Sequence, residues 1–172
     1  MSLRFSAIDA NLALEVNRRS LPRSADEALR RLGILGTQWL LLAAVVAAVL
    51  AAPELGLPMA AAAAGAVALA KGLKYILRRP RPFVVQPAIT VRQVNPPQDP
   101  SFPSADAMRI WFLVASMAFG LALPAAVVAA GILAAASVSF GRLRFGVHYP
   151  LDVWAGSWLG FGAGGIWVDL VS

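Results

Sequence analysis

The sequence contains no cysteine and a single histidine, His148, among its 172 residues. The absence of cysteine excludes disulfides and thiolate metal ligands, and one histidine is too few for a typical zinc centre. We therefore expect neither a metal nor another cofactor. Charged residues are also scarce, at 14%, whereas 59% of the residues are hydrophobic. This balance is typical of an integral membrane protein and disfavours a soluble enzyme.

Five apolar stretches approach the roughly 20 residues that a helix needs to cross a hydrocarbon layer of about 30 Å. They are Gly33–Ala52, Leu55–Leu77, Ala105–Leu123, Ala125–Phe140 and Tyr149–Leu170. The fourth is short and the second contains two lysines, so the count can differ by one. The sequence thus predicts an all-α fold, a membrane-embedded bundle of about five transmembrane helices (33–170) within a single membrane domain of residues 1–172.

The first 32 residues are polar and Arg-rich and show no cleavable signal pattern. Five apolar residues are interspersed among the polar ones: Phe5, Ile8, Leu12, Leu14 and Val16. Ser24-x-x-Glu27 then opens an apolar run in the pattern of a capping box. We expect residues 1–32 to form an amphipathic, interfacial helical segment in the headgroup layer. A partly ordered tail is the alternative.

The net charge of +6 is compatible with nucleic-acid binding, but the basic residues gather at the ends of spans. They are Arg18, Arg19, Arg23, Arg30 and Arg31 before the first span, Arg78, Arg79, Arg81 and Arg92 after the second, and Arg142 and Arg144 after the fourth. If the spans alternate, these groups share one side of the membrane. The positive-inside rule places that side, with the active site, in the cytoplasm. We expect a bacterial plasma (inner) membrane protein whose partner is the lipid bilayer and not nucleic acid.

A Pro-rich loop at about 78–103 separates the second and third spans. Its prolines oppose regular helix or sheet, and ordered loops of this length are commonly lids or binding loops. Ser104 directly follows the loop and is a natural N-cap for the third span. The first N–H groups of that helix would form an anion site. Pro150, tolerated in the first turn of a helix, places His148 at the start of the fifth span.

The histidine belongs to the grouping Arg142-x5-His148-x3-Asp152. A neutral imidazole can attack phosphorus, and an aspartate four residues on along a helix lies on the same face, where it can hold the other ring N–H. A guanidinium matches the oxygens of a transferring phosphoryl group. By themselves, however, these three residues are also compatible with a structural pair.

Three motifs occur in order: Lys74-x6-Arg81-Pro82, Pro103-Ser104 and Arg142-x5-His148-x3-Asp152. Together they resemble the three-part signature of the type-2 phosphatidic-acid phosphatase superfamily, integral-membrane lipid phosphatases related to vanadium haloperoxidases. The resemblance implies that phosphate is bound by Lys74, Arg81, Ser104, the Ala105 amide and Arg142. It further implies that His148 is the nucleophile, forming a phosphohistidine, and that Asp152 orients its ring.

Two positions depart from that signature. Gly141 stands where a serine usually precedes Arg142, and Asp106 stands where the family has the histidine that protonates the leaving oxygen. The helix dipole favours an ionised Asp106, whereas a bound dianion and a low dielectric would raise its pKa. Asp106 is therefore either a catalytic acid or the ion-pair partner of Arg109, one turn on.

General acid catalysis matters most for a poor leaving group such as an alkoxide, and less for a departing phosphate. We therefore expect a metal-independent lipid phosphatase that hydrolyses an isoprenoid or other lipid diphosphate rather than a monoester. The alternatives are a phosphatase of a polyprenyl-linked sugar phosphate or phospholipid precursor, a lipid phosphotransferase, a catalytically impaired lipid-phosphate-binding protein and, remotely, a vanadate-dependent oxidase.

Other polar and aromatic residues have structural explanations. We expect Arg78, Arg79 and Arg144 to contact anionic headgroups. The tryptophans are expected to anchor or pack the helices, with a lipid-tail groove as the alternative. Gly156, Gly160 and Gly164 share one helix face and permit close helix approach. That approach is either within the bundle or, alternatively, in a homo-oligomer.

Overall fold

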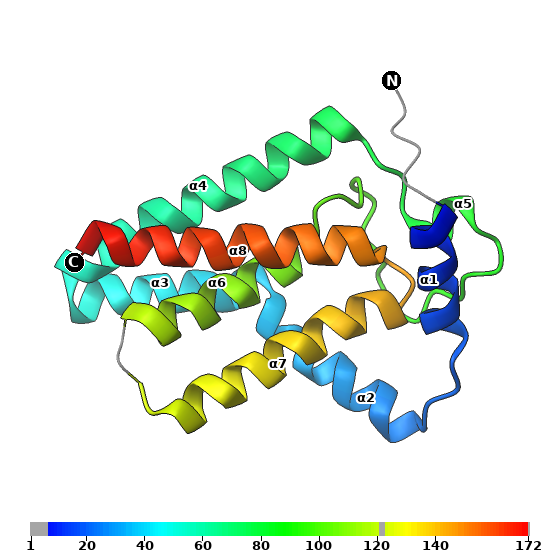
Figure 1. Cartoon of the computed structure of the whole chain (residues 1–172), viewed down its shortest axis with the longest axis horizontal. Helices are drawn as coiled ribbons and strands as arrows, with labels where there is room; N and C mark the ends of the chain where they lie inside the picture. Colours follow the sequence, from blue (N-terminus) through cyan, green and yellow to red (C-terminus); the bar gives the residue numbers. More distant parts are fainter. Residues whose placement is uncertain (1–6, 121–122, 172) are drawn as a thin grey trace.

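The computed structural model describes residues 7–120 and 123–171, and within these ranges the chain is helical with no strand. The elements are α1 (Ala7–Arg18), α2 (Arg23–Leu32), the 3-10 turn η1 (Gly33–Gly36), α3 (Gln38–Ala51), α4 (Pro53–Leu77), the short α5 (Pro82–Val85), α6 (Ala105–Gly120), α7 (Ala125–Arg144) and α8 (Pro150–Val171). The long helices form an elongated bundle, with α1, α5 and the loop that follows α5 at one end (Figure 1). The predicted all-α fold is confirmed.

All five apolar stretches are helical, although their bounds differ from those expected. The first begins as the 3-10 turn, and Thr37 caps α3 by accepting a hydrogen bond from Leu40 N. The fourth continues beyond Phe140 to Arg144. Among the described residues, two helices are long and apolar enough to cross a membrane, at Pro53–Val85 and Ala125–Arg144, and the bent pair Arg23–Gly36 and Gln38–Ala51 would make a third. These measures alone do not confirm the expected number of five.

Helix α8 packs against α6 through its glycine face. A Cβ on Gly156 would lie 2.3 Å from the carbonyl oxygen of Ser104, and one on Gly160 would lie 2.0 Å from that of Met108. Only glycine permits this approach of two backbones. The expected close approach is therefore made inside the chain. The alternative of a homo-oligomer through Gly156, Gly160 and Gly164 is wrong, because α6 already covers that face.

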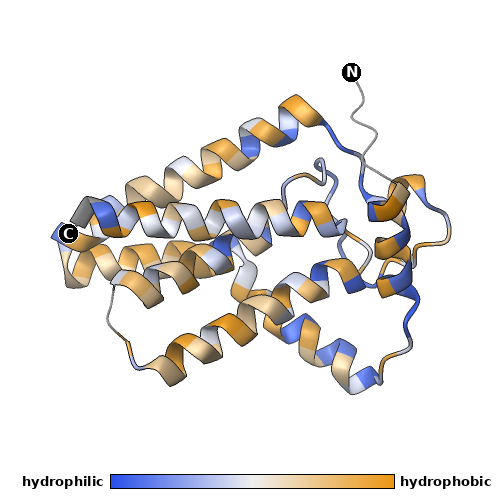
Figure 2. Cartoon of the chain, in the orientation of Figure 1, coloured by the Kyte–Doolittle hydropathy of each residue, from blue (hydrophilic) through white to orange (hydrophobic). Residues whose placement is uncertain are grey.

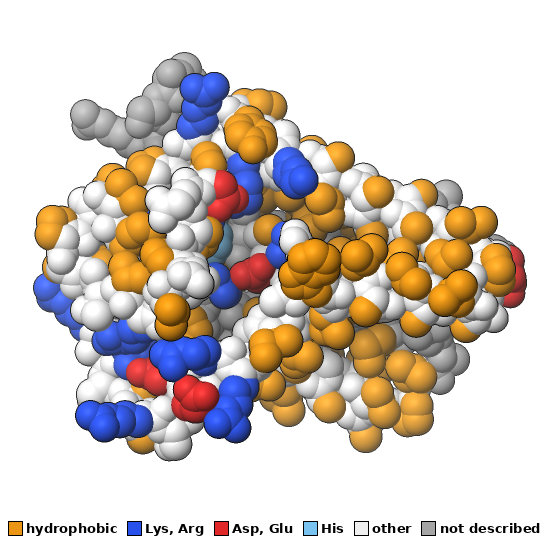
Figure 3. Space-filling model, turned by 180° about the vertical axis from the view of Figure 1, so that it is seen from behind, with side chains coloured by type: hydrophobic (Ala, Val, Ile, Leu, Met, Phe, Trp, Pro, Cys, Tyr) orange, Lys and Arg blue, Asp and Glu red, His pale blue; other side chains and the backbone are white. Residues whose placement is uncertain are grey.

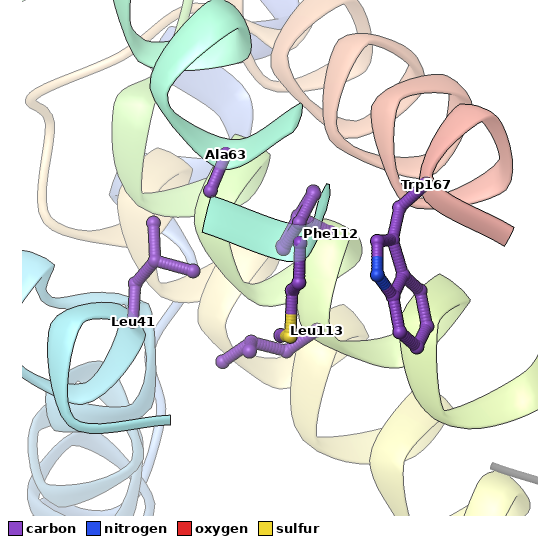
Figure 4. Close-up of a cluster of buried hydrophobic side chains, with 6 residues drawn as sticks. Leu41, Ala63, Phe112, Leu113 and Trp167 are labelled. Atoms are coloured by element: carbon purple, nitrogen blue, oxygen red, sulfur yellow. The ribbon is translucent and has the colours of Figure 1, made fainter. Parts of the chain in front are cut away.

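A buried apolar cluster lies away from the polar end of the bundle and joins α3, α4, α6 and α8 (Figure 4). Trp167 is 1% exposed and donates its indole N–H to the carbonyl of Leu55 at 2.9 Å. Trp167 is thus a packing residue, as expected. Hydrophilic residues gather instead around α1, α2 and the loops at the opposite end (Figure 2). The long helices consist mainly of hydrophobic residues.

The N-terminal segment is helical in α1 and α2, and Phe5 lies outside the described residues. The capping-box prediction is wrong. Helix α2 begins at Arg23 after Pro22, whose φ of −55° and ψ of 146° set the N-cap geometry without a side-chain bond. Glu27 instead forms ion pairs with Arg30 and Arg31 on the exposed face of α2.

Helix α1 turns polar side chains toward the rest of the protein. Asn17 is fully buried and donates to the carbonyls of Thr90 and Arg144 at 2.9 and 3.0 Å. Ile8 and Leu12, by contrast, are 69% and 44% exposed. Asn17 therefore ties α1 to the Pro-rich loop and to the end of α7, and it leaves apolar side chains of α1 on the outside.

Candidate active site

The segments that carry the three motifs meet at one end of the bundle. Helix α4 ends at Leu77, and the next residue, Arg78, adopts a left-handed conformation with φ of 45° that turns the chain out of the helix. The N–H of Ser101 then donates to the carbonyl of Arg79 at 2.8 Å and closes the loop beside α6. On the face opposite to that of Figure 1, the pale blue of a histidine lies in a hollow between basic and acidic side chains (Figure 3).

His148 lies at the centre of this region, 3% exposed. Its Nε2 is 3.2 Å from Nη1 of Arg81, and its Nδ1 faces Oδ2 of Asp152 at 3.5 Å. The second distance is too long for a good hydrogen bond. The carboxylate therefore faces the ring nitrogen without a close contact. Burial lowers the pKa of His148 to about 4, against the opposing effect of Asp152. The ring is therefore neutral near pH 7, the form that a nucleophile requires.

Asp152 is held by two further donors. Its Oδ2 accepts the N–H of Tyr149 at 2.9 Å, and its Oδ1 accepts Nη1 of Arg79 at 2.6 Å. Arg79 also pairs with Asp9 of α1 and stacks 3.8 Å above the Tyr149 ring. The expectation that Arg79 contacts headgroups is wrong, because this side chain is 4% exposed and pairs with Asp9 and Asp152.

Arg144 also departs from the headgroup prediction. It is 3% exposed and pairs with Asp26 of α2 at 2.8 Å. Its Nη1 donates to the carbonyl of Asn17 at 2.8 Å. Arg144 thus connects α7 with the N-terminal helices and faces away from solvent.

Lys74 and Arg81 share one carboxylate that the sequence did not single out. Asp99 Oδ2 lies 3.0 Å from Lys74 Nζ, and Asp99 Oδ1 lies 2.8 Å from Arg81 Nη2. Burial raises the pKa of Asp99, but the hydrogen bonds and positive charges of Lys74 and Arg81 outweigh it and hold the pKa below its usual range. Two of the predicted phosphate ligands are therefore brought together around an anion that the protein itself supplies.

Arg142 lies beside Asp106. Its Nη1 is 3.1 Å from Asp106 Oδ2, and its Nη2 donates to Gln93 Oε1 at 2.9 Å. Asp106 also pairs with Arg109 at 2.8 Å. The ion pair with Arg109 that the spacing suggested is present, and Arg142 adds a second partner. The buried Nε of Arg142 has no hydrogen-bond partner.

Ser104 precedes the first residue of α6 and is completely buried. Its N–H donates to the carbonyl of Asp152 at 2.9 Å, so it is fixed against the start of α8. Its Oγ has no hydrogen-bond partner. Ala105 begins α6, and the first N–H groups of a helix have no acceptor within it. An unpaired buried hydroxyl beside free amide groups is the arrangement that an anion would complete.

The structure thus gathers Lys74, Arg81, Arg142, Ser104 and Ala105 at the end of the bundle that holds His148 and Asp152. Sequence reasoning missed the groups that neutralise or support them: Asp9, Arg79, Gln93 and Asp99. Arg79 stands within the first motif. In this basic segment, however, nothing in the sequence distinguishes an arginine that will be buried from one that will be exposed. Asp99 had a weaker signal, since it is an acidic residue between prolines in the loop expected to bind the ligand.

The model of a family described as the PAP2 superfamily matches residues 55–172. Among characterised proteins, the chain is 38% identical over 138 residues to a decaprenylphosphoryl-5-phosphoribose phosphatase of Mycobacterium tuberculosis, covering 77% of this chain and 71% of that protein. It is 37% identical over 103 residues to an undecaprenyl-diphosphatase of Sulfolobus acidocaldarius, covering 56% of this chain. That alignment spans only about half, 47%, of the archaeal protein.

Two solved structures share the fold. LpxE of Aquifex aeolicus superposes with a TM-score of 0.84 over 98% of this chain and 99% of its own, at 23% identity. A transmembrane PAP2 type phosphatidylglycerolphosphate phosphatase from Bacillus subtilis gives a TM-score of 0.78 over 96% of this chain and 86% of its own, at 22% identity. The helical arrangement is therefore that of known membrane-embedded bundles.

Proposed function

Because this chain belongs to the PAP2 superfamily, we propose that it is an integral-membrane phosphatase that hydrolyses an isoprenoid lipid diphosphate without a metal. One observation carries the proposal. A buried, neutral His148 points Nε2 toward Arg81, while the Ser104 hydroxyl nearby is buried with no partner. A terminal phosphate would satisfy that hydroxyl and the surrounding cations at once.

In this mechanism, Lys74, Arg81 and Arg142 bind the equatorial oxygens of the terminal phosphate, together with the Ser104 hydroxyl and the Ala105 N–H. Asp152 faces the N–H on Nδ1 and thereby favours the tautomer whose lone pair is on Nε2. That lone pair forms the bond to phosphorus as the bond to the bridging oxygen breaks, and the lipid phosphate leaves with the electron pair. Water then attacks the phosphohistidine, which releases inorganic phosphate and restores the imidazole.

The pairing of Asp106 favours a diphosphate over a monoester. Its carboxylate forms ion pairs with both Arg109 and Arg142. The side chain at this position is therefore engaged with two cations, whereas a departing alkoxide needs a proton from an acid. A departing lipid phosphate needs less assistance, so the reaction proceeds without this acid.

A second candidate is the phosphatase of a polyprenyl-linked sugar phosphate, favoured by 38% identity over 77% of the chain to the mycobacterial relative. That reaction expels a sugar alkoxide and needs an acid at Asp106 or a water in its place. The two candidates therefore differ in their requirement for Asp106, and substrate comparison with variants at this position separates them.

The lipid tail is assigned to the groove between α3 and α4, which has a volume of about 500 Å³. Apolar side chains such as Trp39, Val45 and Ala60 line it, and Lys71 and Arg109 also contribute to its wall. Arg109 shares Asp106 with Arg142, so the groove adjoins the anion site. Residues 60 and 71 of α4 are about 16 Å apart along the helix axis, enough to hold several isoprene units.

Residues 1–172 are proposed to act as one membrane domain with its active face in the cytoplasm. Arg19, Arg30 and Arg31 remain exposed at the active end and support this orientation. Four other arginines are buried in ion pairs and hydrogen bonds: Arg79, Arg81, Arg142 and Arg144. Their positions have a structural cause, so they say little about which side of the membrane the active site faces.

The test measures phosphate release by detergent-solubilised protein from polyprenyl diphosphates, polyprenyl-linked sugar phosphates and phosphatidic acid, with chelator present. Native protein is expected to prefer the diphosphate, and His148→Ala to lose at least about a thousandfold in kcat. Equal activity in native protein and His148→Ala would end the nucleophile assignment. Acceptor alcohols added to the same assay reveal a phosphotransferase by their phosphorylated products.

A further inference from the structure

Asp99 is attached to the cation pair by its backbone as well as by its side chain. The carbonyl of Asp99 accepts Nε of Arg81 at 2.7 Å, and the carbonyl of Pro100 accepts Nζ of Lys74. These two bonds do not involve the carboxylate. The loop segment therefore has anchors that persist when the Asp99 side chain changes its position.

The carboxylate and the two cations differ strongly in exposure. The Asp99 side chain is 48% exposed, whereas those of Lys74 and Arg81 are 7% and 4% exposed. A rotation about the side-chain bonds of Asp99 can thus take the carboxylate into solvent. The cations cannot follow it, because Arg81 also donates to the carbonyl of Val147 at 2.8 Å and Lys74 donates to that of Pro100.

We propose that Asp99 sets an affinity threshold at the phosphate site, because its carboxylate occupies the anion position in the free protein and must be displaced by any anion that binds there. The inference rests on the proposed function in one respect, namely that Lys74 and Arg81 receive the substrate phosphate. A guanidinium and an ammonium held around two carboxylate oxygens offer the same donors to two phosphate oxygens.

Charge decides which ligands can displace the carboxylate. A phosphodiester, the headgroup linkage of ordinary phospholipids, carries one negative charge, as the carboxylate does. A terminal phosphate carries up to two, so its attraction to a buried cation pair is greater at the same distance. Displacement of Asp99 lowers the affinity of every anion by the same factor, so the weakly attracted phosphodiesters of the bilayer are kept out while the more strongly attracted terminal phosphates still bind.

The experiment measures binding of two small probes by calorimetry at pH 8: inorganic phosphate, mostly a dianion, and dimethyl phosphate, a monoanion. Native protein is compared with Asp99→Asn and with Glu54→Gln, which removes the same charge at the first turn of α4, far from Lys74 at the last turn. Asp99→Asn is expected to bind both probes at least about threefold more tightly. The same relative gain is expected for both probes, because each must displace the same carboxylate, while Glu54→Gln binds as native protein does.

Equal or weaker binding of both probes by Asp99→Asn would overturn the inference, since it would make Asp99 a residue that positions the cations. If Asp99→Asn does not fold, Asp99→Ser removes the same charge, and the rise in Tm caused by phosphate replaces calorimetry. If Asp99→Asn binds phosphate more tightly but native protein releases phosphate from no lipid, the inference stands and the proposed function does not. Absence of phosphate binding by both proteins would overturn both.

Discussion

Arg79 Nη1 and Asp152 Oδ1 lie 2.6 Å apart in a completely buried contact between residues 73 positions apart in the sequence. The remaining oxygen of Asp152 faces the imidazole of His148. Arg79 therefore fixes the carboxylate that is proposed to orient the nucleophile, and it does so from the turn that ends α4.

We predict that Arg79→Gln lowers kcat by about 10- to 100-fold with a small change in KM, as expected for a group that orients a reacting residue without touching substrate. Breaking the buried pair should also lower the free energy of unfolding by about 3–5 kcal/mol. Arg79→Lys, which keeps the charge, should recover part of kcat. Arg78→Gln, at the exposed neighbouring residue, is the control. A kcat for Arg79→Gln within twofold of native would contradict the positioning role.

The pH dependence of stability should reveal the buried imidazole. The folded pKa of His148, about 4, lies below the ordinary histidine pKa of 6.5, so the unfolded chain binds more protons between these values. Stability from this group is therefore complete above about pH 6.5 and is lost as the pH falls toward 4, by at most about 1.4 kcal/mol per pH unit.

Thermal unfolding of native protein and of His148→Gln between pH 4 and 8 measures this effect. The difference between the two curves should change across pH 4 to 6.5 and be constant above it. Parallel curves throughout would show that the imidazole titrates equally in both states. The same neutral ring predicts that kcat/KM holds its value down to about pH 5.

Replacement of Asp106 distinguishes an acid from an ion-pair partner. Asp106→Asn should change kcat on a polyprenyl diphosphate by less than about tenfold, because a departing lipid phosphate needs little proton assistance. A catalytic acid would instead cost about 10²–10⁴-fold. Asp106→His should raise activity on a lipid monoester. Loss of diphosphate turnover in Asp106→Asn, with retained phosphate binding, would argue for the acid.

The glycines of α8 provide a stability test with internal controls. Gly160→Ala places a methyl 2.0 Å from the carbonyl oxygen of Met108, whereas Gly162→Ala and Gly165→Ala meet no atom within 4 Å. We expect Gly160→Ala to lower the free energy of unfolding by about 1–3 kcal/mol. The two control variants should be neutral or slightly stabilised, because alanine is the better helix former. Unfolding in detergent, followed by circular dichroism, makes the comparison.

The proposed tail groove can be filled without touching the anion site. Ala64 lines the groove between α3 and α4, so Ala64→Trp should raise KM for a long polyprenyl diphosphate by about tenfold, the loss of a few buried methylene contacts. KM for a short-chain analogue should change little. Leu69→Trp, on an exposed part of the same helix, is the matched control. Equal effects on both chain lengths would place the tail elsewhere.

The sequence by itself determined the helices and the residues of the three motifs. Long apolar stretches form helices for local reasons, since chain length and side-chain polarity decide whether a segment can be buried in lipid. The bounds of α4 and α8 lie within two residues of those expected. The exact starts of helices were less predictable, because an N-cap depends on backbone angles that several residues can adopt. Pro22 at the start of α2 and Thr37 at the start of α3 are the examples.

Only the tertiary structure decided how the charges of the site are balanced. Three ion-pair arrangements balance them: Asp99 lies between Lys74 and Arg81, Asp106 between Arg109 and Arg142, and Arg79 between Asp9 and Asp152. Most of these partners are many residues apart along the chain, and the spacing of charges in a sequence does not specify which of many basic residues will be buried. The cost of desolvation decides which basic residues are buried, because a charge removed from water must be paired with an opposite charge. That choice is made when the helices pack.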